Sequence, residues 1–209
     1  MRSVYTLLLK EYGTLNWWPA ETPFEVMLGA ILTQNTAWSN VEKAINNLKN
    51  KNLLDAEKLS NTDNSIIAEQ IKPSGYYNIK TTRIKNFLHW YQQSGGYQKL
   101  LNLPTLDLRK QLLSVNGIGF ETADDIMLYA FERRIFVIDA YYRRIFKRLG
   151  FIAGDEKYEV LRLQAETDFD GSVQEFNEYH ALLVEHAKRH CKVKPLCEGC
   201  CLKEKCRYE

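Results

Sequence analysis

The sequence predicts an all-α fold, and three observations support that prediction. Apolar residues recur three and four positions apart along most of the chain, which is the spacing of one face of a helix. No segment alternates apolar and polar residues over more than a few positions, and the strand-like run Phe136–Ile138 is too short to build a sheet. Glycine and proline separate the periodic segments, as they do between short helices.

The first quarter of the chain predicts three helices. Residues Ser3–Glu11 form the first. The second begins after Thr22, which is expected to be its N-cap, with a proline in the first helical position and Glu25 completing a capping box. It ends at the polar cluster 33–36, and a third amphipathic helix follows Trp38.

Two adjacent tryptophans, Trp17 and Trp18, precede Pro19 before the second helix. Proline restricts the residue before it to an extended conformation, so the two rings do not share one helical face. They are either core anchors where the chain crosses itself or an aromatic wall for a flat ligand.

The middle of the chain continues the helical pattern. Two shorter helices are expected between Asp55 and Lys72, and Pro73–Gly75 breaks the chain after them. A longer helix then extends to Gly95–Gly96, and the segment Leu106–Leu113 predicts one more.

That last helix leads into a glycine hairpin, Asn116–Gly119. A Gly-apolar-Gly turn requires positive φ or a close approach of another backbone. The helix that follows, with Ala123 and Ala130 on its apolar face, starts with free N–H groups and the positive end of its dipole. Gly117 and Gly119 therefore frame a seat for an anion such as a DNA phosphate, although an ordinary interhelical turn would have the same sequence.

Asp139 follows Gly119 by twenty positions and comes directly after a short apolar run. A carboxylate in this place is a candidate for chemistry on whatever the hairpin holds. The alternative is a structural one, because aspartate directly before a helix is also a common N-cap.

All five cysteines lie in the last nineteen residues, where Cys191, Cys197, Cys200 and Cys206 have the spacing C-x5-C-x2-C-x5-C. Disulfides are uncommon in cytosolic proteins, so clustered thiols indicate a metal. Four sulfur ligands suit zinc or an iron–sulfur cluster. A zinc ribbon pairs two C-x2-C hooks and this chain has one, and either Cys200 or the adjacent Cys201 could be the third ligand.

Composition indicates a globular protein of one or two domains, with 209 residues of which 45% are hydrophobic. No apolar run approaches the roughly 20 residues of a membrane span, and the N-terminus lacks a signal-peptide pattern, so we expect a cytoplasmic protein with no membrane partner. The net charge of +2 says little about a nucleic-acid partner. Basic residues nevertheless crowd the helix after Asp139 and the cysteine region, and each group is either a DNA-facing surface or an ordinary solvated face.

The hairpin, the downstream aspartate and the cysteine loop, in this order, resemble the helix-hairpin-helix DNA glycosylases of the endonuclease III type. The resemblance extends from about Pro23 to Cys206. It implies a central helical lobe at 22–136, with the helix-hairpin-helix motif at about 106–131, and a second lobe made of 1–21 plus 137–209. The cysteine loop at 191–206 would hold a [4Fe–4S] cluster, with zinc as the alternative. Family members have one more residue in the first cysteine gap than this chain has.

The resemblance also assigns roles to individual residues. Asp139 would be the catalytic carboxylate. Double-stranded DNA containing a damaged base would be bound by a monomer through Gln34, Asn35, Gly117, Gly119, Arg143 and Arg144. The pairing of Trp17–Pro19 with Leu32–Trp38, together with His186–Lys188, is similar to the 3-methyladenine DNA glycosylase III branch. In that branch the base pocket corresponds to Trp17, Trp18, Trp38, Lys188 and Glu121.

These roles predict a monofunctional base excision glycosylase for alkylated purines. The target base must first leave the stack, and a carboxylate then stabilises the positive sugar that forms as the N-glycosidic bond breaks. A ring-alkylated base is already cationic and is recognised by electron-rich aromatic faces. Bifunctional relatives carry a lysine two residues after the second hairpin glycine, where this chain has Glu121, and a carboxylate cannot form their imine. The alternatives are a mismatch or oxidised- or deaminated-base glycosylase, acting for example on uracil, thymine or adenine, and a non-catalytic DNA-binding module.

Overall fold

The computed structural model describes residues 1–15, 17 and 20–208, and across them the chain is helical with no β-strand. The all-α prediction is therefore confirmed. The chain divides into two compact units. One is Pro19–Phe131, here called the central unit, and the other joins Met1–Trp18 to Glu132–Glu209, here called the terminal unit. No helix among the described residues has the length and apolar character needed to cross a membrane.

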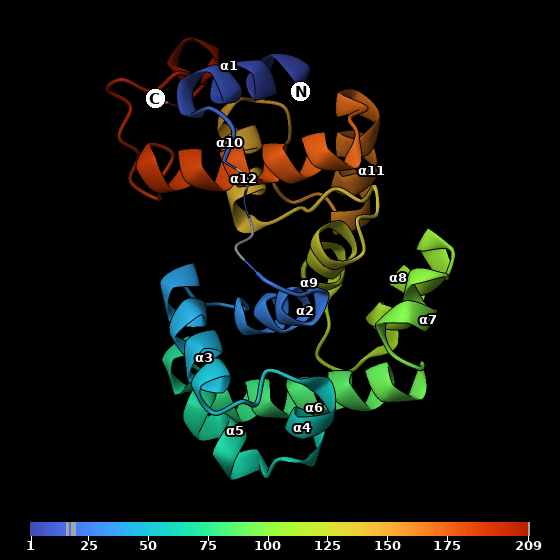
Figure 1. The fold of residues 1–209 in the computed structure, drawn as a ribbon. Helices are drawn as coiled ribbons and strands as arrows, with labels where there is room; N and C mark the ends of the chain where they lie inside the picture. The colour runs from blue at the N-terminus through green and yellow to red at the C-terminus, as the bar shows by residue number, and fades with distance from the viewer. Residues whose placement is uncertain (16, 18–19, 209) are drawn as a thin grey trace. The chain divides into compact units, whose positions relative to one another are not determined.

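The central unit contains eight α-helices and two short turns, labelled in Figure 1. They are α2 (Pro23–Leu32), α3 (Trp38–Asn50), α4 (Ala56–Asn61), α5 (Asn64–Ile71), the 3₁₀ turn η1 (Lys72–Ser74), α6 (Tyr77–Gln93), α7 (Tyr97–Leu101), α8 (Thr105–Ser114), α9 (Phe120–Asp125) and the π-helical turn η2 (Ile126–Ala130).

Helix α2 is the core of this unit. It packs against α3, α6, α9 and η2, and every residue from Glu25 to Leu32 is buried. Thr22 caps it, accepting a hydrogen bond from the Glu25 N–H at 3.1 Å, as predicted. The return bond of the predicted capping box is displaced by one residue, because the Glu25 carboxylate accepts from the N–H of Glu21 rather than from that of Thr22.

Two lysines, one buried and one half-buried, donate hydrogen bonds to carbonyl groups at helix ends. Lys80 Nζ donates to the carbonyl oxygens of Leu32 and Ser74, each at 2.7 Å, and burial lowers the pKa of Lys80 to about 8. Lys85 Nζ donates to three carbonyl oxygens at the end of α4, those of Leu59, Ser60 and Thr62. The last carbonyls of a helix have no partner within it, so these lysines fix α2 and α4 to helix α6.

A buried ion pair joins the two helices that flank the glycine hairpin. Arg109 on α8 donates from Nε to Asp124 Oδ1 at 2.6 Å and from Nη2 to Oδ2 at 3.0 Å, and Asp124 on α9 is fully buried. A bidentate guanidinium–carboxylate pair fixes both distance and orientation. It therefore sets the angle at which the chain enters and leaves the hairpin.

Replacing Asp124 with Ala is expected to destabilise the fold by about 3–5 kcal/mol, because it removes the buried carboxylate that accepts two hydrogen bonds from Arg109. Chemical denaturation monitored by circular dichroism measures this change. Asp107→Ala, on the exposed face of α8, is the matched control and should cost less than about 1 kcal/mol. Equal effects at the two positions would show that the buried pair does not hold the hairpin helices together.

The terminal unit contains α1 (Arg2–Tyr12), α10 (Ala140–Arg148), α11 (Tyr158–Phe169), α12 (Val173–Arg189) and the 3₁₀ turn η3 (Lys203–Lys205). Helix α12 packs against both α1 and α10 (Figure 1). The core of the terminal unit contains a group of buried aromatic side chains, those of Phe136, Tyr142, Phe146, Phe169, Phe176 and Tyr179. Neither α11 nor α12 was predicted individually from the sequence, although α12 begins with a complete capping box between Ser172 and Glu175.

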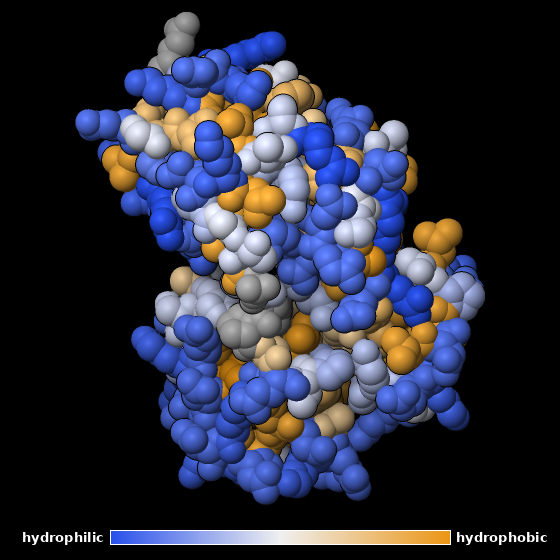
Figure 2. Space-filling view, turned by 45° about the horizontal axis from the view of Figure 1, so that its top comes forward, coloured by the Kyte–Doolittle hydropathy of each residue, from blue (hydrophilic) through white to orange (hydrophobic). Residues whose placement is uncertain are grey.

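Figure 2 shows one face of the molecule, on which hydrophilic residues predominate in both units and apolar residues form small separate patches. The large apolar side chains that are exposed include Tyr76, Leu106, Val160 and Val193. Scattered apolar side chains of this kind are normal on a globular surface.

Candidate active site

The glycine hairpin needs glycine at only one of its two positions. Gly117 has a φ of 98°, and a Cβ there would lie 2.3 Å from Cγ of Arg83, so no larger residue fits. Gly119 has a φ of −89° and ψ of 178°, which any residue adopts, and a Cβ there would meet nothing within 4 Å. The expectation of a strained or crowded backbone is therefore confirmed for Gly117 and is wrong for Gly119 within the described residues.

The polar turn after α2 is hydrogen-bonded to this hairpin. Gln34 Nε2 donates to the Gly117 carbonyl oxygen at 3.0 Å and to Thr122 Oγ1 at 2.9 Å. Arg83 on α6 donates to the Gln34 side-chain oxygen. Both ends of the Gln34 amide are thus used inside the central unit, and a role against DNA would require it to exchange these bonds. Its neighbour Asn35 is exposed, with a φ of 54°.

The two predicted pocket residues of the central unit lie at helix starts. Trp38 is the first residue of α3 and is half-buried. Glu121 is exposed in the first turn of α9, whose N-cap Gly119 supplies no side-chain cap.

Asp139 is the N-cap of α10, which confirms the structural alternative considered for it. Its Oδ1 accepts a hydrogen bond from the N–H of Tyr142 at 2.7 Å. Its other oxygen, Oδ2, lies 3.5 Å from Nε2 of His180 on α12. Because capping occupies only one of the two oxygens, the same carboxylate remains able to act on a ligand.

Three further side chains of the terminal unit extend from Asp139. The Trp17 ring centroid is 5.7 Å from that of His180, with the rings tilted by 47°. Lys188 Nζ lies 5.7 Å from the Trp17 centroid. The structure thus links Asp139 to Trp17 through His180, a residue that the sequence did not single out, and Trp17 in turn contacts Lys188. Trp18 lies outside the described residues.

The two arginines predicted to bind DNA have hydrogen-bond partners within the terminal unit. Arg143 donates to the Glu156 carbonyl oxygen at 2.9 Å, and Arg144 donates through Nε to the Cys191 carbonyl oxygen at 2.7 Å. Their proposed contacts with DNA stay predictions, but Arg144 already braces the cysteine loop.

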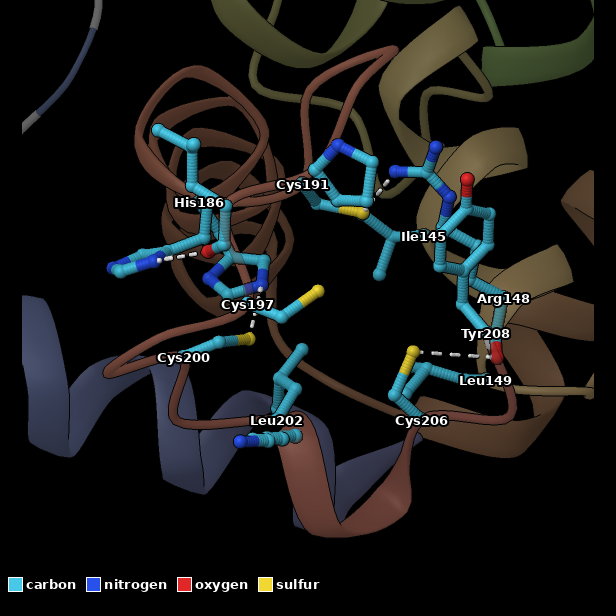
Figure 3. Close-up of a pocket in the computed structure, with 14 residues that line it drawn as sticks. Ile145, Arg148, Leu149, His186, Cys191, Cys197, Cys200, Leu202, Cys206 and Tyr208 are labelled. Carbon is cyan, nitrogen blue, oxygen red and sulfur yellow. Dashed lines mark hydrogen bonds between the residues drawn. The ribbon is translucent and has the colours of Figure 1, made fainter.

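The four cysteines predicted as ligands line one cavity of about 90 Å³. Figure 3 shows their sulfur atoms approaching the cavity from different sides, beside the apolar side chains of Ile145, Leu149 and Leu202. Cys201 is not among the lining residues, and its electrostatic neighbours include Glu11 of α1. The structure therefore favours Cys200 over Cys201 as the candidate ligand, because only Cys200 lines the cavity.

The lining of the cavity fits a metal group bound by several cysteine thiolates. Arg148 Nη1 donates to Cys191 Sγ at 3.2 Å, and the same guanidinium donates to the Lys192 and Val193 carbonyl oxygens. A cation bonded to a ligand sulfur offsets the charge that four thiolates bring together. Among the described residues, no three or more His, Cys, Asp or Glu side chains converge closely enough for a single ion. Sulfur ligands of this kind suit either zinc or an iron–sulfur cluster.

The comparisons with known proteins identify the family. Residues 28–168 match the model of the HhH-GPD superfamily base excision DNA repair proteins. A Methanocaldococcus jannaschii protein named provisionally as a DNA repair glycosylase is 48% identical over 97% of this chain and 94% of its own length. The chain belongs to the HhH-GPD superfamily.

Two other relatives lie further away. Endonuclease III of Sulfolobus acidocaldarius is 29% identical over 88% of this chain and 82% of its own length. The 3-methyladenine DNA glycosylase of Helicobacter pylori, whose crystal structure was solved bound to 1,N6-ethenoadenine, has 27% sequence identity to this chain. It superposes with a TM-score of 0.74 over 89% of this chain and 96% of its own. The HhH-GPD match includes the hairpin and Asp139 but not Trp17, His180 or the cysteines.

Proposed function

We propose that this HhH-GPD protein is a monofunctional DNA glycosylase that removes alkylated purines of the 3-methyladenine type from double-stranded DNA. The observation that carries the proposal is that the Asp139 carboxylate and the electron-rich Trp17 ring both lie close to His180, within one unit of the fold. A carboxylate and an aromatic face are the two groups that this reaction needs.

Asp139 supplies the chemistry. Breaking the N-glycosidic bond develops positive charge on the sugar, and a nearby carboxylate stabilises that charge and orients or deprotonates the attacking water. Tyr142 holds one oxygen of Asp139 through the helix cap, so the carboxylate has a fixed direction before the nucleotide arrives. A preorganised carboxylate does not need to reorient as the charge forms.

Trp17 supplies selectivity for the base. A base alkylated on a ring nitrogen is cationic, and the face of an indole attracts cations. Lys188 lies over the same ring but is exposed, so an incoming base displaces it without breaking a buried contact. The relative from Helicobacter pylori, a 3-methyladenine glycosylase bound to an ethenoadenine, supports this substrate class. For Trp18, Trp38 and Glu121, a role in binding the base stays a prediction from the sequence.

The glycine hairpin would bind the DNA backbone. Gly119 has open space where a side chain would stand, so a phosphate can approach the N–H groups that open α9. We assign Gly117, Gly119, Gln34 and Asn35 to the strand that carries the damaged base. Arg143 and Arg144 add positive charge at the start of α10.

The cysteine cavity is proposed to hold a [4Fe–4S] cluster bound by Cys191, Cys197, Cys200 and Cys206, with zinc as the alternative. When bound, the cluster would act structurally and keep the basic loop after α12 folded. Arg144 and Arg148 already tie this loop to α10.

A substrate panel tests the proposed function. Purified protein is incubated with duplexes carrying 3-methyladenine, uracil, a G·T mismatch or an A·G mismatch, and the released bases are quantified. Release of 3-methyladenine is the expected result. Preferential release of uracil, thymine or adenine would instead show a mismatch or deaminated-base glycosylase, and binding without release would show a DNA-binding module.

Strand cleavage tests the monofunctional mechanism. Because Glu121 occupies the place of the imine-forming lysine, we expect intact strands until alkali is added, and no covalent adduct with borohydride. Glu121→Lys is the matched variant and should introduce detectable trapping. Robust trapping by the wild-type protein would show that another amine acts as the nucleophile.

A further inference from the structure

We infer that His186 is a positioning residue for the metal group, with its imidazole donating a hydrogen bond to the ligand sulfur of Cys200. The inference rests on the proposed metal site, since it concerns one of the four cysteines assigned to that site. It adds a side chain of α12 that is not itself a ligand, and it connects helix α1 to the same site through Tyr12.

His186 is a buried histidine in the lining of the cysteine cavity. It belongs to the last turn of α12 and is 1% exposed. Its Nε2 lies 3.6 Å from Cys200 Sγ, a hydrogen-bonding distance for sulfur, and Figure 3 marks this contact with a dashed line. Its carbonyl oxygen accepts a hydrogen bond from the N–H of Cys191 at 3.0 Å. One residue of α12 therefore contacts two of the four candidate ligands.

The chemistry of a metal-bound cysteine decides which atom of the His186–Cys200 hydrogen bond carries the proton. Cysteine binds metals as a thiolate, and a thiolate has no proton to donate. Nε2 of His186 must therefore be the donor when Cys200 is a ligand. In a neutral imidazole with its proton on Nε2, the other ring nitrogen, Nδ1, is an acceptor.

Tyr12 fits this arrangement of the imidazole. Its hydroxyl lies 2.9 Å from His186 Nδ1, so it can donate to that nitrogen while Nε2 donates to the sulfur. Tyr12 is the last residue of α1 and is half-buried. A ring that is bonded at both nitrogens cannot turn away from the sulfur without breaking a bond. Tyr12 therefore fixes the direction of the His186 ring, as outer hydrogen-bond partners do for histidines in metal sites.

A hydrogen bond to a ligand sulfur has two expected consequences. The donor offsets part of the negative charge of the thiolate, and removing an outer partner of this kind typically lowers metal affinity by about 10–100-fold. In an iron–sulfur cluster, hydrogen bonds to the sulfurs also raise the reduction potential, because they favour the more negative reduced state. His186 should therefore slow metal loss and raise the potential of a bound cluster.

Substitutions at His186 test the donor. Protein purified anaerobically is mixed with excess EDTA, and the iron or zinc that remains bound is measured over time. His186→Leu removes the donor and should lose metal about 10–100 times faster than wild type. His186→Gln keeps a side-chain N–H and should stay within about threefold of the wild-type rate. In iron-containing protein at equal iron content, His186→Leu should also have a lower reduction potential, which looser packing alone does not predict.

Tyr12→Phe tests the connection to α1 with a small change, because it removes only the hydroxyl that holds the His186 ring. It should speed metal loss by about threefold to tenfold, less than His186→Leu does. Tyr5→Phe is the matched control on the same helix, since the Tyr5 ring contacts those of Phe169 and Tyr179. It should lose metal at the wild-type rate.

Equal rates of metal loss in His186→Leu and wild type would overturn the inference, and so would equal rates in His186→Gln and His186→Leu. A wild-type rate in Tyr12→Phe would overturn the role of α1. Wild-type protein without bound iron or zinc would refute the inference together with the proposed metal site. Base release is measured separately with the substrate panel, so metal retention that depends on His186 in a protein that releases no base would uphold the inference and refute the proposed function.

Discussion

Replacing Asp139 with Asn is expected to lower the rate of base release by at least about 10²–10³-fold, the loss measured when one preorganised electrostatic group is removed from an active site. Asparagine keeps the shape and reach of the side chain but carries no charge to place against the sugar. Because asparagine caps helices about as well as aspartate, the bond to the Tyr142 N–H should survive and α10 should stay folded. Single-turnover release of 3-methyladenine measures the loss directly.

The control for this substitution is Asp168→Asn, which neutralises an exposed carboxylate on α11. It should leave the rate unchanged. Affinity for a duplex with the damaged base should stay within about threefold of wild type in both variants, since Asp139 acts after the nucleotide is bound. A fall in thermal stability or in DNA affinity as large as the fall in rate would mean that Asp139 serves the fold and not the chemistry.

Features of the site that depend on neighbouring residues in the sequence could be predicted, whereas contacts between distant segments could not. Gly117 was predictable because its positive φ is a local property of a Gly-apolar-Gly turn. Asp139 was predictable as an N-cap and as a candidate catalyst for the same reason, since both depend on the helix that begins beside it. The four cysteines were predicted as ligands from their spacing, and the structure places all four around one cavity.

Contacts between distant segments were not predictable in this way. His180 is one polar residue within the apolar face of α12, and nothing in the local pattern shows that it meets a carboxylate 41 positions earlier. Arg83 likewise has no motif of its own, yet it fills the space that forces glycine at 117 and holds the side chain of Gln34. The helices α11 and α12 were not predicted individually, although the Ser172–Glu175 capping box marks the start of α12 in the sequence.

Replacing Cys200 with Ser is expected to remove most of the iron and the visible absorbance of the protein, whereas Cys201→Ser should retain both. Cys200 lines the shared cavity with the other three cysteines, and Cys201 does not. Loss of one thiolate leaves three candidate ligands, so the metal group would hold the loop after α12 less firmly, although the hydrogen bonds from Arg144 and Arg148 remain. The Cys200→Ser protein should therefore also unfold at lower temperature, since a bound metal group stabilises only the folded state.

The two adjacent cysteines make this pair of variants a closely matched comparison, because each removes one sulfur from neighbouring positions of the same loop. Iron and sulfide analysis of anaerobically purified protein gives the ligand assignment, and thermal unfolding gives its structural consequence. Stoichiometric zinc in place of iron would change the identity of the group but keep the assignment of Cys200. Equal iron loss in both variants, or iron loss in Cys201→Ser alone, would contradict the assignment of Cys200 as a ligand. In either case the Cys201 thiol, which does not line the cavity, would have to act as a ligand.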